Sequence, residues 1–302
     1  MAAVPNQRSM SDVHPEHDFH AEAHALSGRM ELPVNQEIQK QAAVSLNDWR
    51  GGHSFQRTDN YSLEGVIAFK SGYTHVSGNP SKKQGHGWVT LATSVLEGLN
   101  VLDVITADRM TAQVSTEHAI LEGYVPQVTF LGTQFENLRV GGYPVHLELD
   151  LNVCGEKPPG DRSYLTELSF LDRVNQQRSA VWENSDLPTK VRAEYYEERQ
   201  NLAAVRKQTG FGKEVRSIKC SLVKSIEPIP VAKICGNVLQ IPGFGVVSLA
   251  DLEVGVKPIY DPQSSRPESH YFTLTMITMH MGCIGEGMLA GGTVTANGHN
   301  KP

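Results

Sequence analysis

Hydrophobic and polar residues alternate along much of the chain, as they do in a half-buried β-strand. Over residues 109–115, Met110, Ala112 and Val114 alternate with polar neighbours, and residues 146–151 alternate in the same way. The segment 88–95 is rich in β-branched residues, and Gly141-Gly142 marks a tight turn before the second alternating run. The pattern therefore predicts strands joined by short turns from about residue 63 to residue 151.

The period of the pattern then changes to that of a helix. Apolar residues fall at helical spacing in two runs, Leu165, Leu168, Leu171 and Val174, then Val191, Tyr195, Leu202 and Val205. Pro188 suits the first turn of the second helix, and Asp186 is a candidate N-cap. The loop 184–187 separates the two runs, so the sequence predicts an αα-hairpin at about 161–209.

The strand pattern resumes after residue 212. Residues 238–249 predict a hairpin around the turn Pro242–Gly245, and Tyr271–Met281 is the longest strand candidate. Its apolar set shifts from Phe272, Leu274 and Met276 to Ile277, Met279 and Met281, which predicts a bulge or burial on both faces.

Strands on both sides of one helical block favour a mainly β protein, a β-sandwich or barrel with an inserted αα-hairpin. We expect residues 61–302 to form this single β domain. Residues 1–60 carry little apolar periodicity and many polar residues. They are therefore expected to form a polar, partly disordered N-terminal arm with a short helix over residues 12–26.

Composition narrows the class of partner and the compartment. The 302 residues carry a formal net charge of -6, which argues against a nucleic-acid-binding protein. The sequence contains no run of about 18 apolar residues, so no membrane span is expected, and residues 1–30 lack the apolar segment of a signal peptide. We therefore expect a cytoplasmic protein. Its four cysteines form no CxxC pair and are expected to be reduced.

Several motifs resemble those of a known family. Val95-Leu96-Glu97-Gly98-Leu99-Asn100-Val101-Leu102 and the glycine turn in 135–145 resemble the first half of the bacterial choice-of-anchor P β domains. Residues 238–249 and the long strand 272–280 resemble the second half, so the resemblance covers about 88–151 and 217–296. It implies a non-catalytic β domain that is secreted or attached to the cell surface. This chain departs from the family in its helical hairpin, in Asp251-Leu252-Glu253, and in lacking a recognisable export signal.

Four histidines near the start of the chain are a candidate metal site. His14, His17, His20 and His24 are spaced so that a helix over 12–26 would place them on one side. Imidazoles this close suit Zn²⁺, Ni²⁺ or Cu²⁺, although the motif is not the HExxH of zinc proteases. The alternative is a polar arm without a specific ligand, in which case the protein has no cofactor.

His118, next to Glu117, is a candidate general base if the strands bring Asp108 close to it. The alternative is an exposed strand end. Neither a nucleophile elbow nor a phosphate-binding loop is present. Cys220 alternates with Ile218 and Leu222, which favours a core position over a nucleophile. Met276, Met279 and Met281 likewise favour a core over a ligand pocket.

Three functions therefore remain open. The preferred one is a non-catalytic structural or binding protein, a β scaffold for self-assembly or partner recognition. Its expected partner is another copy of the chain or another protein, with the polar face of the hairpin (Arg192, Glu194, Glu198 and Arg199) as one candidate surface. The alternatives are an enzyme or small-ligand binder that uses a β-barrel pocket, and metal handling by the N-terminal histidines.

Overall fold

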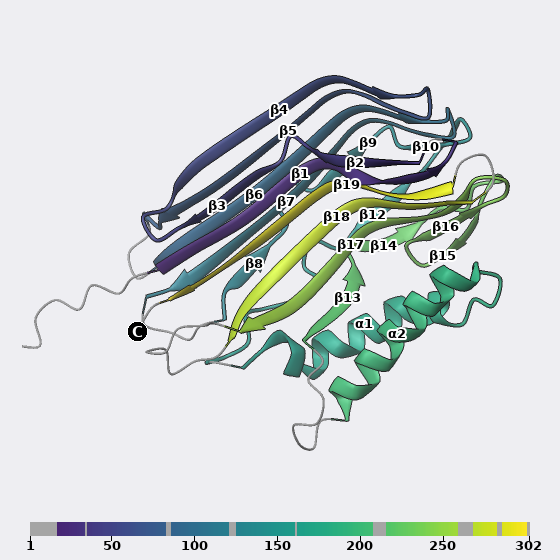
Figure 1. Cartoon of the computed structure of the whole chain (residues 1–302). Helices are drawn as coiled ribbons and strands as arrows, with labels where there is room; N and C mark the ends of the chain where they lie inside the picture. The colour runs from purple at the N-terminus through teal and green to yellow at the C-terminus, as the bar shows by residue number, and fades with distance from the viewer. Residues whose placement is uncertain are drawn as a thin grey trace, which may run out of the picture.

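Two antiparallel sheets lie face to face in a computed structural model, which describes residues 17–33, 35–82, 86–120, 125–160, 162–207, 216–258, 268–282 and 286–300. Figure 1 shows that the strand axes of the two sheets are nearly aligned, and that the helical hairpin lies on the outside of one sheet. The protein is mainly β and sandwich-like, with two helices, as the sequence pattern predicts.

The first sheet, sheet A, combines strands from both ends of the described chain. Its order is β15-β16-β17-β18-β19-β1-β2, with β13 beside β17 and β3 beside β1. The bounds are β1 His17–Leu32, β2 Gln36–Gln41, β3 Val44–Asp48, β13 Ser217–Ser221, β15 Lys233–Cys235, β16 Val238–Ile241, β17 Gly245–Pro258, β18 Glu268–Gly282 and β19 Glu286–Asn300. The pairing of β1 with β19 places the two ends of the described chain side by side within this sheet, next to the edge strands β2 and β3.

The second sheet, sheet B, is built from consecutive strands in the order β11-β10-β7-β6-β5-β4, with β8 and β9 beside β7. The bounds are β4 Gly52–Leu63, β5 Ile67–Pro80, β6 His86–Val101, β7 Ile105–Ala119, β8 Gln127–Thr129, β9 Gln134–Glu136, β10 Arg139–Val140 and β11 Tyr143–Pro144. A separate pair joins β12 (Leu147–Leu149) to β14 (Val223–Ile226). Sheet B packs on sheet A chiefly where β5, β6 and β7 lie over β1 and β19.

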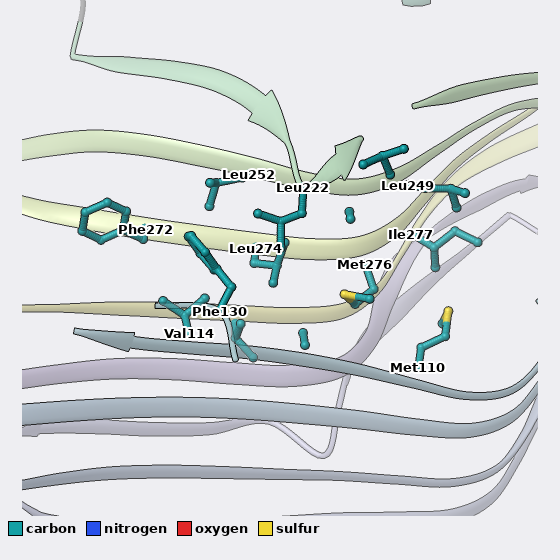
Figure 2. Close-up of a cluster of buried hydrophobic side chains, with 14 of the residues drawn as sticks. Met110, Val114, Phe130, Leu222, Leu249, Leu252, Phe272, Leu274, Met276 and Ile277 are labelled. Atoms are coloured by element: carbon teal, nitrogen blue, oxygen red, sulfur yellow. The ribbon is translucent and has the colours of Figure 1, made fainter. Parts of the chain in front are cut away.

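Apolar side chains from the facing sides of the sheets fill the space between them. Met110 and Val114 of β7 lie opposite Leu274 and Met276 of β18, and all four are fully buried (Figure 2). The predicted core positions Cys220, Met279 and Met281 are also buried. The interior is thus a packed core rather than the open barrel pocket that the enzyme alternative requires.

The predicted parity change in the long strand 271–281 is confirmed, because Met276 and Ile277 are both fully buried. The registers of β18 with β17 and β19 continue unchanged on both sides of this point. The flanking strands instead adopt left-handed backbone at Ala250 (φ +49°) and Gly292 (φ +64°). A Cβ on Gly292 would lie 3.1 Å from Met276 Cγ. The position therefore favours glycine both for its left-handed backbone and for the close approach of Met276.

The helical hairpin lies on the outer face of sheet A, beside β13 (Figure 1). It consists of α1 (Leu168–Trp182) and α2 (Thr189–Arg206), preceded by the 3₁₀ turn η1 (Tyr164–Thr166). A second apolar cluster holds it there, formed by Val181, Leu187, Val191, Tyr195, Val238 and Val246. The predicted N-cap is wrong, because Pro188 occupies that position and Asp186 pairs with Lys233 at 2.5 Å instead.

The prediction of a polar N-terminal arm is wrong for residues 17–60. These residues form β1 to β3 and most of β4, and β1 is an interior strand of sheet A, paired on both sides. The pattern was misleading because three of the seven buried positions of β1 are alanines, and because β4 is largely polar on both faces. Residues 1–16 lie outside the described residues.

Three cysteines of the described chain, Cys154, Cys220 and Cys235, are free thiols, as expected. Neither of the two described α-helices is long and apolar enough to cross a membrane.

Candidate functional site

The N-terminal histidines do not share one face, because they lie on a strand rather than on the predicted helix. In β1 the residues alternate between buried and partly exposed positions. His17 therefore points between the sheets, while His20 and His24 point away from them. His20 lies 3.4 Å from Glu22, and His24 contacts Ser27 at 3.0 Å. His14 lies outside the described residues.

His17 instead meets His118, the histidine of the other predicted site. Their ring centroids are 4.7 Å apart, and the His17 ring stacks on Trp88 at 5.1 Å. Trp88 and His118 are directly opposite one another in the pairing of β6 with β7. Gly298 leaves room for this contact, since a Cβ there would lie 2.5 Å from His17 Nε2. Residues far apart in the sequence thus form one aromatic cluster.

His118 is completely buried, contrary to the exposed strand end that was its alternative. Neither of its ring nitrogens has a hydrogen-bond partner among the described residues. Burial is the main reason that the pKa of His118 lies well below its ordinary value, and the nearby His17 and His270 lower it further. The imidazole is therefore neutral at neutral pH, and no substrate in solution can reach it.

His270 brings a third strand to this end of the sandwich. Its Nε2 lies 2.8 Å from Ser163 Oγ, and its ring packs edge-on against Tyr164 with 6.5 Å between the centroids. Burial lowers the pKa of His270 to about 4. We refer to His17, His118 and His270 as the histidine cluster. Burial lowers the pKa of His118 and of His270, so the fold opposes their protonation, and His17 is buried against His118.

The structure separates the predicted acid–base pair. Asp108 is exposed near the other end of β7, where its Oδ2 accepts a hydrogen bond of 2.7 Å from Asn137 Nδ2. The length of extended strand between them places Asp108 roughly 30 Å from His118. The described residues also contain no group of three or more His, Cys, Asp or Glu side chains arranged to hold a metal ion.

A buried ion cluster, which the sequence did not reveal, fixes the hairpin to sheet A. Arg178 of α1 is 1% exposed and donates 2.7 Å hydrogen bonds to Glu198 of α2 and to Asn237. Asp251 of β17 lies 3.7 Å from the same guanidinium, whose Cζ is 5.0 Å from the centroid of the Tyr195 ring. Burial opposes the charge of Arg178, but Glu198, Tyr195 and Asp251 outweigh it and raise its pKa.

This ion cluster revises the surface expected for the hairpin. Glu198 belongs to the buried cluster, whereas Arg192, Glu194 and Arg199 are exposed. A hollow of about 200 Å³ lies between α2 and sheet A beside the cluster, and a larger one of about 730 Å³ lies between α1 and the β12–β14 pair. Neither hollow is lined by a residue predicted as catalytic or metal-binding.

Strand β4 is the outer strand of sheet B and is exposed along most of its length (Figure 1). It pairs with β5 from Gly52↔Gly78 to Leu63↔Ile67 and, in the described part of the chain, with no other strand. Half of its backbone N–H and C=O groups therefore point away from the sheet. Phe55 on this strand is 53% exposed, and Trp49 in the turn before it is 52% exposed.

The other sheet edges are short or protected. In sheet A, β2 spans only residues 36–41 and carries Lys40, and β15 spans only 233–235. In sheet B, β11 is the pair Tyr143–Pro144, and proline has no N–H to donate. Charged residues, proline and shortness are the usual means by which proteins prevent pairing at an edge. The part of β4 over residues 52–59 is longer than these edges and has neither lysine nor proline, and its two charged side chains, Arg57 and Asp59, bind each other.

Fold and surface together define an antiparallel β-sandwich protein with a helical hairpin on one sheet and a long open edge on the other. Residues 17–255 match the family model described as a domain of unknown function, DUF8256, and the chain belongs to this family. No curated protein and no solved structure matches the chain.

Proposed function

We propose that the protein is a non-catalytic β scaffold that assembles with copies of itself through the open edge of sheet B. The observation that carries the proposal is the long edge strand β4, which pairs on one side only among the described strands and is exposed along most of its length. A strand in this state binds another strand through its free backbone groups. The exposed rings of Phe55 and Trp49 add apolar area at the same edge.

The candidate chemistry supports a binding role over catalysis. The histidine cluster is enclosed in the core, and Arg178 is neutralised by the carboxylates that surround it. Asp108 and His118 lie at opposite ends of one strand. Recognition of a different protein would use the same backbone groups of β4, so self-assembly is the form of the proposal that can be tested without knowing another partner.

Sedimentation velocity over a wide range of protein concentration tests the proposal. We expect the mass to rise from 33.2 kDa toward a multiple of that value as the concentration increases. Gln56→Lys places a charge on β4 and should shift association to higher concentration. Gln39→Lys is the matched control, because Gln39 is likewise exposed, on β2 at the edge of sheet A. A wild-type protein that stays at 33.2 kDa at every concentration refutes self-assembly.

A further inference from the structure

The open edge has a regular part with two distinct faces. From Gly52↔Gly78 to Asp59↔Ser71, β4 follows β5 without a register shift. Phe55 packs on Tyr73 with ring centroids 6.2 Å apart on the outer face, while Thr58 Oγ1 accepts a hydrogen bond from Ala42 N on the side of sheet A. By alternation, the outer face of this part carries His53, Phe55, Arg57 and Asp59.

This regular part ends at Asn60, whose backbone is left-handed (φ +54°). Beyond it the faces change, since Tyr61 stacks on the buried Phe69 with centroids 5.1 Å apart and packs against the core. Only residues 52–59 therefore present an unbroken alternation of side chains to a second strand.

Symmetry limits how two such strands can pair. Two identical antiparallel strands at adjoining edges are related by a two-fold axis perpendicular to the sheet, so the outer faces of both copies lie on the same side. Residues directly opposite one another then lie on the same face, so their numbers are both odd or both even. The two-fold axis therefore passes between two copies of one residue, the centre of the register. Centres at Phe55 and Gln56 each overlap seven of the eight residues of the regular part, and a centre at Arg57 overlaps five.

Charge distinguishes these three registers. A centre at Arg57 places the arginines of the two copies opposite each other, which is unfavourable for like charges. A centre at Phe55 places His53 opposite the partner's Arg57, which is not a complementary pair. A centre at Gln56 places His53 opposite the partner's Asp59 and Phe55 opposite the partner's Arg57. The first of these pairs joins imidazole to carboxylate, and the second joins an aromatic ring to a guanidinium. Only this register is complementary at every outer position.

We infer that two copies pair their β4 strands antiparallel about a two-fold axis at Gln56, an inference that rests on the proposed self-assembly. The two B sheets then form one continuous sheet. Arg57 and Asp59 already bind each other within one strand, with Arg57 Nε 2.8 and 2.9 Å from the two carboxylate oxygens, so their charges are held on the outer face. Because the symmetric contact uses β4 of both copies and the other edges are short or protected, the assembly closes as a dimer.

Single cysteines on β4 report the register directly. A cysteine at the centre faces its own copy across the axis, where directly opposite Cβ atoms are close enough for a disulfide after small adjustment. We therefore expect mild oxidation to cross-link Gln56→Cys into a covalent dimer on non-reducing gels, whereas Phe55→Cys and Arg57→Cys remain monomeric. The parent chain, which has the same native cysteines, is the control for background cross-links.

A charge exchange provides a second, independent readout. In the inferred register, residue 53 of each copy faces residue 59 of the other. His53→Asp therefore places two carboxylates opposite each other at both ends of the contact. Asp59→Lys places a lysine opposite a histidine at both ends. Each variant alone should lose the dimer in sedimentation. An equimolar mixture of the two should recover it, because the introduced aspartate of one copy then faces the introduced lysine of the other. At the opposite end of the same contact, the unchanged His53 and Asp59 form the native pair.

The outcomes separate the register from the assembly itself. Cross-linking at Gln56→Cys with recovery in the mixture supports the inferred dimer. Cross-linking at Phe55→Cys or Arg57→Cys instead overturns the register. A wild-type dimer that none of the three cysteines cross-links overturns the role of β4: self-assembly then stands, but not through the open edge of sheet B. A wild-type monomer at every concentration refutes the proposed function, and this inference with it.

Discussion

Acidification from pH 7 to pH 5 should destabilise the fold through the histidine cluster, and His270 allows the magnitude to be worked out. Burial lowers its pKa to about 4 in the folded protein, against about 6.5 in the unfolded chain. The unfolded chain therefore takes up the proton first. The contribution of His270 to stability is complete above about pH 6.5, is lost as the pH falls toward about 4, and does not change further below that.

At pH 5 the difference between these two pKa values costs about 2 kcal/mol of the free energy of unfolding. His118 acts in the same direction, because it is completely buried and its pKa is also lowered. A domain is stable by only about 5–15 kcal/mol, so the loss is a large share of the total. We expect the midpoint of urea denaturation to fall steeply between pH 6.5 and pH 5.

His270→Gln tests the assignment, because glutamine does not titrate and still offers Ser163 a hydrogen-bonding group. Urea denaturation followed by far-UV circular dichroism at pH 7 and pH 5 should show that this variant loses about 2 kcal/mol less than the wild type. His146→Gln is the control, because His146 is exposed. If His270→Gln and the wild type lose equal stability over this range, the reasoning is refuted.

Two further perturbations test the anchoring of the hairpin and the core between the sheets. Arg178→Met leaves the buried carboxylate of Glu198 unpaired and should cost about 3–5 kcal/mol, measured by chemical denaturation, whereas Arg178→Met combined with Glu198→Met should recover much of that loss. Phe272→Ala removes a fully buried ring and should cost about 3–5 kcal/mol in the same assay, while Phe55→Ala on the exposed edge should cost far less at concentrations where the protein is monomeric.

The sequence predicts those strands whose two faces differ in polarity. The alternation around Met110 and Val114 identifies β7, because one face of that strand lies against sheet A and the other does not. The two helices are found because their apolar stripes cover the outer face of sheet A. Strand β1 is missed because its buried positions include Ala21, Ala23 and Ala25, which fit the close approach of the sheets but carry little hydrophobic signal.

The candidate site could be predicted only where a local signal exists. Arg178 carries one, since it lies at helical spacing from the apolar Val174 and Val181, on the buried side of α1. The contact of His17 with His118 has no local signal. It depends on which strands face each other across the sandwich, and β1 reaches its place only by pairing with β19 at the other end of the described chain.

The polarity that hid β4 from the hydrophobic pattern is consistent with the role inferred for it. A strand that pairs through its backbone at an edge needs no apolar face, since its affinity comes from main-chain groups and its register from a few side chains. Residues 53–59 fit this description, with polar side chains at every position except Phe55. An outer strand that merely covered the core would be expected to bury one face, as β4 does after Asn60, where Leu63 is buried. The two halves of the strand thus differ: residues 61–63 pack against the core of their own chain, whereas residues 53–59 have the polarity and exposure that the proposed pairing requires.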